Sequence, residues 1–308
     1  MKILLPSFWQ DINWKYFREN CGEKTYEFEV SGCKALVIEK SPHVLKFWKK
    51  KVWELQRGPY GNIEYTTELL QKIFLEAKQQ KTERVRVFPP LGIPDFWKQY
   101  SPLLGGSFEG VCTESAPEIF PENTLFLDLE KTEDEIFAQM KQGGRRNIRK
   151  AIKANIEIFE ETDIRNFWKI LQETAIRDKF VTNKKFVYEE MVKSYSSKNS
   201  DINMKKSVVL SARDETGEVI ASTIFCVSGE MGVYYYGASS NQKREKMAPY
   251  LLQWEGMKWA KKNGAKQYDF LGLAPENSPE HQLASVSQFK LKFGGKRIVS
   301  DAGIDFIL

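Results

Sequence analysis

The sequence has 308 residues, of which 42% are hydrophobic; at roughly 150 residues per domain this length predicts about two domains with buried cores and excludes a disordered chain. The net charge of +5 is compatible with an anionic partner, and the mean hydropathy of −0.47, with no apolar run near the ~20 residues of a spanning helix, excludes a membrane-spanning protein. The four cysteines include no Cys-x-x-Cys pair, which excludes a zinc ribbon, and two histidines are too few for a histidine-rich metal site. The sequence also lacks the Walker A and Gly-x-Gly-x-x-Gly motifs of nucleotide-binding loops and the Gly-x-Ser-x-Gly motif of serine hydrolases.

The first half of the chain predicts a hairpin, a strand, a helix and a strand. Residues 26–30 and 34–39 flank a Ser31-Gly32 turn, which is typical of a β-hairpin. A weakly alternating strand is expected at 51–56, before Arg57-Gly58-Pro59. Apolar residues three and four apart predict a helix over 64–81, and a strand is expected at 84–88.

The second half repeats this order. Strands are expected at 207–213 and 218–227, with a turn between them, then a strand at 231–236, a helix at 248–263 and a strand at 266–271. Gly32 and Gly217 lie 185 residues apart, and Phe88 and Phe270 lie 182 apart. The repeat predicts a duplicated α/β domain with mixed rather than doubly wound sheets, although coincidence is the alternative.

A strand at 125–129 precedes Thr132 and Glu135, which form a capping box at the start of a helix. We therefore expect the domain boundary near Glu130, with domains at 1–129 and 130–296. No apolar stretch at the N-terminus is long enough for a signal peptide, so a cytoplasmic location is expected.

The helix after that cap carries a basic cluster made of Lys141, Arg145, Arg146, Arg149, Lys150 and Lys153. Gly143-Gly144 permits a kink or a break within this helix. Ile148, Ala151 and Ile152 can face a core. The other side of the helix then presents several arginines, whose guanidinium groups can bind phosphates. A solvated charged face is the equally weighted alternative.

Two further stretches are candidates for a site. Residues 233–240, followed by 248–255, place a glycine directly after an aromatic strand, where a ligand can approach the backbone. A packed aromatic strand explains the same pattern. In 288–295, Lys290 and Lys292 lie on one face of a strand, or near a helix end capped by Gly294, and both are otherwise ordinary surface lysines.

Together these stretches resemble the Fem family, the aminoacyl-tRNA-dependent transferases that build the interpeptide bridges of peptidoglycan. The matching stretches are 124–129, 145–151, 174–180, 236–239, 252–255 and 289–295, with Arg57-Gly58-Pro59 in the first half. The resemblance implies an α/β fold of two tandem acetyltransferase-like (GNAT) domains. It also implies that the tail, 297–308, completes the first domain. No long heptad run is present, so the chain resembles the compact members without a coiled-coil arm.

The resemblance implies transfer of an amino acid from aminoacyl-tRNA to a free amine of a peptidoglycan precursor, either UDP-linked or lipid-linked. The implied catalytic residues are Lys290, Phe289, Tyr236 and Tyr234. The implied substrate-binding residues are Arg177, Asp269, Tyr250 and Arg57. The implied tRNA-binding residues are Arg145, Arg146, Arg149, Lys150, Lys243 and Arg244.

Ordinary GNAT enzymes hold coenzyme A with a glycine-rich loop at a helix N-terminus. The corresponding loop, 241–248, has no glycine and several charges, so coenzyme A is disfavoured. No other cofactor and no metal are expected. A monomer with peripheral membrane contact at most is expected. Two alternatives stay open: the same donor acting on a small-molecule or natural-product amine, and a non-catalytic RNA-binding protein on the same fold.

Overall fold

The computed structural model describes residues 3–40, 51–99, 112–196 and 206–308. The chain divides into two compact units. The first comprises Met1–Asn123 and Ile298–Leu308, and the second comprises Thr124–Arg297. The division falls after residue 123 rather than 129, because the strand that starts at Asn123 pairs within the sheet of the second unit.

The first unit is built on a mixed sheet of eight strands in the order β1-β5-β3-β4-β6-β15-β7, with β2 paired to β3. Its strands are β1 (Ile3–Leu4), β2 (Lys24–Val30), β3 (Cys33–Lys40), β4 (Val52–Gln56), β5 (Tyr60–Asn62), β6 (Arg84–Phe88), β7 (Cys112–Ser115) and β15 (Ile304–Ile307). Its helices are η1 (Phe8–Gln10), α1 (Ile12–Asn20), η2 (Ile63–Tyr65), α2 (Thr66–Gln79) and α3 (Phe96–Gln99).

The C-terminal strand β15 belongs to the first unit although it comes last in the chain. It pairs antiparallel with both β6 and β7. Phe306 of β15 is fully buried and lies 4.8 Å, between ring centroids, from Phe74 of α2. The tail therefore fills a gap in the sheet and contributes to the core beneath α2.

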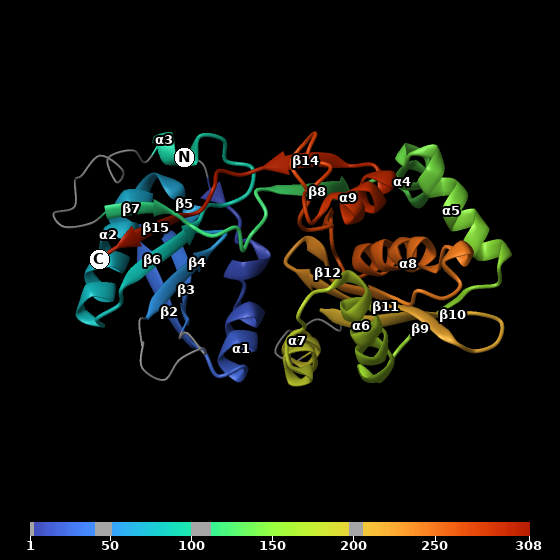
Figure 1. Ribbon diagram of the computed structural model, residues 1–308. Coiled ribbons are helices and arrows are strands. Elements are labelled where there is room, and N and C mark those ends of the chain that lie inside the picture. The colour runs from blue at the N-terminus through green and yellow to red at the C-terminus, as the bar shows by residue number, and fades with distance from the viewer. Residues whose placement is uncertain (1–2, 41–50, 100–111, 197–205) are drawn as a thin grey trace. The chain divides into compact units, whose positions relative to one another are not determined.

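The second unit is built on a seven-stranded sheet in the order β14-β8-β13-β12-β11-β10-β9. Its strands are β8 (Asn123–Asp128), β9 (Glu157–Glu160), β10 (Ser207–Arg213), β11 (Val219–Ser228), β12 (Met231–Ser239), β13 (Gln267–Asp269) and β14 (Lys296–Val299). Its helices are α4 (Glu133–Gln139), α5 (Gln142–Lys153), α6 (Arg165–Asp178), α7 (Lys185–Ser196), η4 (Arg244–Lys246), α8 (Ala248–Lys262), α9 (Ala284–Lys290) and η5 (Leu291–Phe293). Figure 1 shows α8 on one face of this sheet and α6 and α7 on the other.

The repeat expected from the sequence is present in the strand pairing. In the first unit the β2–β3 hairpin is followed by β4, α2 and β6, and β6 runs parallel to β4. In the second unit the β10–β11 hairpin is followed by β12, α8 and β13, and β13 runs parallel to β12. The sequence analysis did not predict the strand β9 or the helices α6 and α7, which lie between α5 and the second hairpin.

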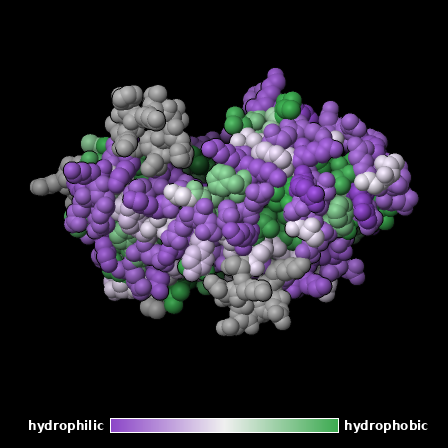
Figure 2. Space-filling model, turned by 90° about the horizontal axis from the view of Figure 1, so that it is seen from below, coloured by the Kyte–Doolittle hydropathy of each residue, from purple (hydrophilic) through white to green (hydrophobic). Residues whose placement is uncertain are grey.

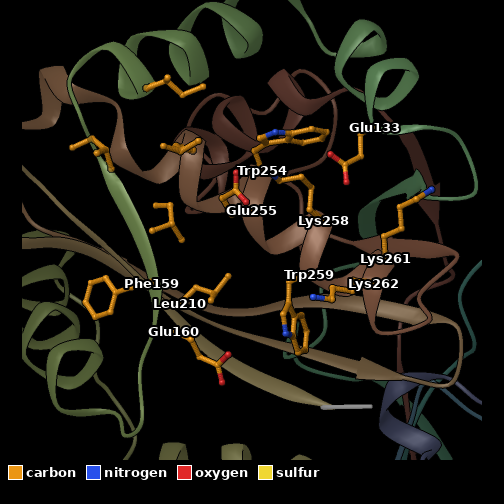
Figure 3. Close-up of a pocket in the computed structure, with 14 residues that line it drawn as sticks. Glu133, Phe159, Glu160, Leu210, Trp254, Glu255, Lys258, Trp259, Lys261 and Lys262 are labelled. Atoms are coloured by element: carbon orange, nitrogen blue, oxygen red, sulfur yellow. Dashed lines mark ion pairs between the residues drawn. The ribbon is translucent and has the colours of Figure 1, made fainter. Parts of the chain in front are cut away.

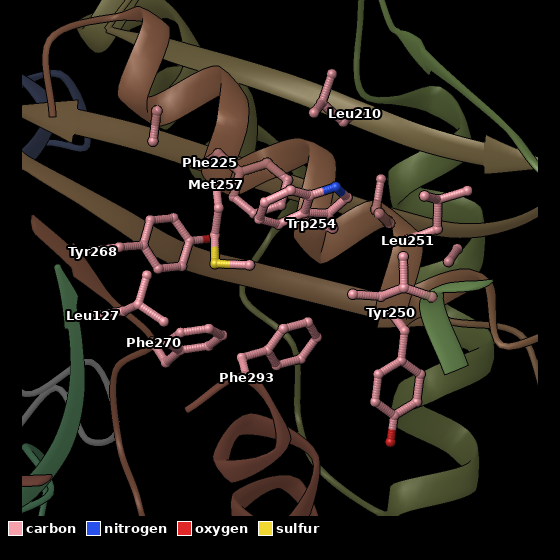
Figure 4. Close-up of a cluster of buried hydrophobic side chains, with 14 of the residues drawn as sticks. Leu127, Leu210, Phe225, Tyr250, Leu251, Trp254, Met257, Tyr268, Phe270 and Phe293 are labelled. Carbon is pink, nitrogen blue, oxygen red and sulfur yellow. The ribbon is translucent and has the colours of Figure 1, made fainter. Parts of the chain in front are cut away.

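The core of the second unit lies between α8 and the sheet (Figure 4). The rings of Tyr268 and Phe270 lie 5.0 Å apart, and Phe270 stacks on Phe293 at 5.4 Å between centroids. Burial of each such side chain stabilises the fold by about 1.5–3 kcal/mol. Gly256 of α8 faces Phe225 of β11, and a Cβ atom at this glycine would overlap the Phe225 ring. The glycine therefore sets how closely α8 approaches the sheet.

The basic helix begins later than the sequence suggests. The capping box of Thr132 and Glu135 is formed, but α4 ends at Gln139, and α5 begins at Gln142. The break therefore lies at residues 140–141, and Gly143-Gly144 continues helically in the first turn of α5. A Cβ atom at Gly144 would overlap the backbone oxygen of Lys292, so this glycine allows close packing instead of a kink.

Hydrophilic side chains cover most of the face shown in Figure 2, with hydrophobic ones in smaller patches. None of the helices in the described part of the chain combines the length and the hydrophobicity that crossing a bilayer requires.

Candidate functional site

A cavity of about 600 Å³ opens in the second unit where β12 ends. Its wall combines side chains from α5, α6, β11, β12, the N-terminal turn of α8, α9 and η5. The polar groups in the lining include Thr174, Arg177, Tyr234, Tyr250 and Lys292. Segments more than 100 residues apart in sequence therefore converge on one concave site, as expected of a binding or active site.

A β-bulge in β12 shapes this cavity. Tyr236 pairs with Ile224 and Tyr234 pairs with Phe225, so Tyr235 is an extra residue. Tyr234 lines the cavity, whereas Tyr236 lies against Tyr188 of α7, with 4.7 Å between ring centroids. The two tyrosines expected at the reaction centre are thus separated, because the extra residue breaks the alternation of the strand.

Tyr234 has a restricted position and a protonated hydroxyl. Its oxygen occupies the space in which a side chain at Gly237 would lie. Burial raises the pKa of Tyr234 to about 12. Near neutral pH the hydroxyl is therefore a hydrogen-bond donor at the cavity wall, and it has little tendency to act as a base.

Lys290 lies behind the cavity wall. It is 6% exposed, and its Nζ donates to the carbonyl oxygens of Leu271 (3.0 Å) and Gly272 (2.8 Å). Burial lowers the pKa of Lys290 to about 8, partly opposed by the nearby Asp269 carboxylate. The Nζ lies 5.9 Å from the Tyr234 ring centroid. Lys290 thus fixes the segment after β13 beside Tyr234, and it is not among the lining residues.

Asp269 is also buried behind the wall, with 2% of its surface exposed. Its carboxylate accepts hydrogen bonds from the Thr124 hydroxyl and from the Leu271 backbone N–H, the latter at 2.7 Å. These bonds join the ends of β8 and β13. The structure therefore gives Asp269 a positioning role and does not bring it to the cavity surface.

Arg177 and Thr174 fasten α6 to the end of β12. Arg177 donates to the Ser239 carbonyl at 2.8 Å, and Thr174 accepts from the Ser239 N–H at 3.1 Å. The other nitrogens of Arg177 bind the Asp178 carboxylate at 2.7 and 2.8 Å, which lowers the pKa of Asp178. Arg177 lines the cavity, with most of its donors engaged.

Three residues form an aromatic and cationic part of the lining. Tyr250 and Phe289 meet edge to face, with 4.9 Å between centroids. Lys292 donates to the Tyr250 hydroxyl at 3.0 Å and makes no ion pair with any described carboxylate. The sequence identified Tyr250 and Phe289, but Lys292 was interpreted only as a surface residue. The sequence held no signal that separated Lys292 from Lys290.

The charged loop after β12 is tied to the β10–β11 turn. Lys243 binds Asp214 and Glu218, and Lys246 binds Asp214 at 3.1 Å and Glu215 at 2.6 Å. The hydrogen bond from Lys243 is the main cause of a pKa for Asp214 far below its usual range. Lys243 is therefore neutralised within the protein, whereas Arg244 is exposed at the cavity edge.

The basic residues of α5 divide into two groups. Arg145 donates to the carbonyl oxygens of Ala138 (2.9 Å) and Met140, and so stabilises the end of α4. Arg146, Arg149 and Lys150 are exposed. Lys141 and Lys153, at the two ends of this helix, are exposed as well, whereas the side chain of Arg145 turns back onto the preceding helix.

Arg57 belongs to the first unit and is not part of this cavity. It is 3% exposed and donates to the Pro89 carbonyl (3.3 Å), the Ser300 hydroxyl (2.5 Å) and the Pro121 carbonyl (2.6 Å). Three segments of the first unit, including the C-terminal tail, are held by this one guanidinium. Within this unit the structure gives Arg57 a structural role, and its predicted contact with a substrate stays a prediction.

A larger groove of about 990 Å³ runs between α5, β9 and α8 (Figure 3). Its floor is mainly apolar, and Lys258 pairs with Glu255 at 2.7 Å. Lys261 donates to backbone carbonyls of Leu129 and Lys131. Two of the three lysines in its lining are thus engaged by the protein, so the smaller cavity, whose lining includes Arg177, Tyr234 and Lys292, is the better candidate site. The described residues contain no cluster of three or more metal-ligating side chains.

Comparison with known proteins shows similarity over nearly the whole chain. The model of the FemAB family matches residues 4–206 and 201–303. The lipid II:glycine glycyltransferase of Staphylococcus haemolyticus (strain JCSC1435) is 23% identical over 321 residues, which cover 82% of this chain and 75% of that relative.

Solved structures share the fold. The crystal structure of FemX superposes with a TM-score of 0.80 at 17% identity, covering 98% of this chain and 92% of the other. A tandem GNAT protein from the clavulanic acid biosynthesis pathway superposes with a TM-score of 0.51 at 9% identity, covering 90% and 80%. The expectation of two GNAT-like domains with mixed sheets is therefore confirmed.

Proposed function

Because this chain belongs to the FemAB family, we propose that it transfers an amino acid from an aminoacyl-tRNA to a free amine of a peptidoglycan precursor. The resemblance seen in the sequence is confirmed by the family match, and with it the assignment as a transferase. Relatives named lipid II:glycine glycyltransferase support a lipid-linked acceptor, and a UDP-linked precursor is the soluble form to test beside it.

The proposed reaction breaks one bond and forms another. The acceptor amine attacks the ester carbonyl, an amide bond forms, the bond to the ribose oxygen breaks, and this oxygen leaves with a proton. Negative charge develops on the carbonyl oxygen, where a fixed donor contributes about 3–4 kcal/mol. The single observation that carries the proposal is the cavity at the bulged end of β12, which combines the protonated Tyr234 hydroxyl with Lys292.

The exposed charges support an RNA donor. Arg146, Arg149 and Lys150 on α5, with Arg244 at the cavity edge, are available to phosphates. The loop at 241–248 has no glycine, and Lys243 and Met247 adopt left-handed backbone angles there. This loop disfavours close approach of a pyrophosphate, so we propose a reaction without coenzyme A or another cofactor, in the cytoplasm where charged tRNA is present.

The test is a panel of charged tRNAs combined with UDP-linked and lipid-linked precursors, with product mass as the readout. We expect one labelled amino acid to be added to an amine of a precursor. Tyr234→Phe, which removes only the hydroxyl, should slow this transfer. Turnover with an acyl-coenzyme A but with no charged tRNA would overturn the proposed donor. Transfer to a small amine but to neither precursor would overturn the proposed acceptor.

A further inference from the structure

An exposed apolar surface lies at the connection between α6 and α7. Four large hydrophobic side chains within a short stretch of chain are exposed: Ile176, Phe180, Val181 and Phe186. The exposed fraction is 98% for Val181 and 81% for Ile176. A single exposed hydrophobic residue needs no explanation, but a group of them is typical of an interaction surface. We call this surface, residues 176–186, the α6–α7 patch.

The two helices direct their part of the α6–α7 patch away from the sheet. Ile176 follows the buried Thr174 by two residues, and Phe186 precedes the buried Tyr188 by two. Two residues turn an α-helix by about 200°, so Ile176 and Phe186 lie opposite the buried faces. Since α6 and α7 cover the same face of the sheet (Figure 1), both side chains belong to the outer surface of one helical layer.

The connection between the helices has a defined conformation. The Phe180 N–H donates to the Ala175 carbonyl at 3.2 Å, and the Asn183 N–H donates to the Tyr188 hydroxyl at 3.1 Å. These bonds fix the backbone on both sides of Val181, whose side chain is left in solvent. The exposure of Val181 is therefore a property of the folded surface, and only a partner outside this layer can bury it.

The charges of the α6–α7 patch favour an anionic partner. Residues 176–186 contain four basic side chains and one acidic one. The acid, Asp178, is paired with Arg177, and the lysine that begins α7 is paired with a glutamate one turn later. Lys179 and Lys184 are exposed and make no ion pair with any residue that the structure describes. Two available ammonium groups thus lie among exposed hydrophobic side chains.

We propose that the α6–α7 patch binds the surface of an anionic lipid bilayer. Hydrophobic side chains next to lysines bind such a surface by entering the interface while the ammonium groups meet lipid phosphates. Protein interfaces, in contrast, are depleted of lysine. The inference rests on the proposed function, because Arg177 and Asp178 also line the cavity. A bilayer bound at the patch therefore brings the cavity edge to the surface that presents a lipid-linked acceptor.

The test is co-sedimentation with vesicles of equal parts phosphatidylglycerol and phosphatidylcholine, beside vesicles of phosphatidylcholine alone. The unaltered protein should bind the anionic vesicles more tightly, and salt should weaken this binding. Val181→Asp should weaken it roughly 10-fold or more, because an acid replaces an inserting side chain. Lys184→Glu should weaken it roughly 10- to 30-fold, because the charge at the surface is reversed. Equal binding by all three proteins would overturn the inference.

The matched control is Leu75→Asp. Leu75 is an exposed hydrophobic residue on α2 of the first unit, so this variant makes a comparable change outside the α6–α7 patch. It should bind the anionic vesicles as the unaltered protein does, and a loss equal to that of Val181→Asp would contradict a specific surface. All three variants should keep the Tm of the unaltered protein, because the altered side chains are exposed.

Two further measurements separate the patch from other roles of Val181. Self-association that Val181→Asp abolishes, without vesicle binding, would assign the patch to a second copy of the chain and overturn the inference. Val181→Asp should slow transfer to a vesicle-borne, lipid-linked precursor and leave transfer to a UDP-linked one unchanged. Equal slowing with both precursors would place Val181 at the cavity and overturn the inference.

Because vesicle binding is measured without transfer, the two proposals fail separately. Protein that binds anionic vesicles through the α6–α7 patch but transfers no amino acid contradicts the proposed function alone. Protein that transfers an amino acid and binds vesicles equally well with and without Val181→Asp contradicts the role of the patch alone.

Discussion

The phenolic oxygen of Tyr234 fills the space that a side chain at Gly237 would need. The glycine is required here for space and not for a left-handed backbone, because its φ lies outside the positive range. The bulge at Tyr235 turns Tyr234 toward the cavity, and the missing side chain three residues later lets the ring lie across the strand. The position of the Tyr234 ring in the cavity wall thus depends on the absence of a side chain at position 237.

Gly237→Ala should therefore impair transfer by displacing Tyr234. We expect kcat to fall roughly 10- to 1000-fold, the range for loss of one electrostatic donor, and to match the loss in Tyr234→Phe. Gly143→Ala is the control, because its new methyl group meets Lys292 at an ordinary 3.9 Å. Steady-state kinetics of the three variants provide the measurement, and full activity in Gly237→Ala would show that the position of Tyr234 is unimportant.

Lys290 should make stability depend on alkaline pH. Burial lowers its pKa to about 8, so between about pH 8 and 10.5 the unfolded chain binds more protons than the folded chain. The free energy of unfolding of the unaltered protein, relative to that of Lys290→Met, should therefore rise with pH across this window, by about 3 kcal/mol in total. Urea unfolding of both proteins at several pH values measures the difference. Parallel pH profiles would contradict a lowered pKa.

Asp214 should stabilise the loop after β12 at neutral pH. Asp214→Asn weakens the bonds from Lys243 and Lys246, and we expect Tm to fall by roughly 2–4 °C for each kcal/mol that is lost in a unit of this size. Because the pKa of Asp214 lies below its usual value, its contribution is complete above about pH 4 and is lost as the pH falls further. The Tm difference between the two proteins should therefore shrink in acid.

Glu157→Gln is the matched control for Asp214→Asn. Glu157 also forms an ion pair, with Arg213 at 2.7 Å, but both partners are exposed. Exposed pairs contribute little to stability, so this variant should change Tm much less. Equal Tm changes in the two variants would show that burial of Asp214 has no energetic consequence.

Neighbouring arginines on α5 should have opposite phenotypes. Arg145→Ala removes hydrogen bonds to the Ala138 and Met140 carbonyls and should lower the free energy of unfolding by about 1–3 kcal/mol. Arg146→Ala should leave stability unchanged and weaken RNA binding, with the slope of log affinity against log salt reduced by about one. Urea unfolding and RNA titrations at several salt concentrations test both expectations. A loss of stability in Arg146→Ala but not in Arg145→Ala would show that Arg146, and not Arg145, has the structural role.

Local sequence patterns were sufficient for the secondary structure that carries each unit. The apolar stripe expected over 64–81 forms α2 (Thr66–Gln79), and the one expected over 248–263 forms α8 (Ala248–Lys262). The hairpins and the capping box at Thr132 were predicted as well, since caps and turns depend on neighbours in sequence. The family was recognisable from short motifs spread along the chain, and the repeated order of elements predicted the duplication.

Only the tertiary structure decided what each side chain contacts. Arg57 was expected at a substrate, and the structure shows that it binds Ser300, a residue far away in the sequence. Lys290 and Lys292 are two residues apart, yet one is buried against backbone carbonyls and the other lines the cavity. Hydrophobic periodicity identifies the buried face of an element but not the surface that it packs against. Burial, hydrogen-bond partners and the bulge that separates Tyr234 from Tyr236 arise from contacts between distant segments, and so they were decided only when the chain folded.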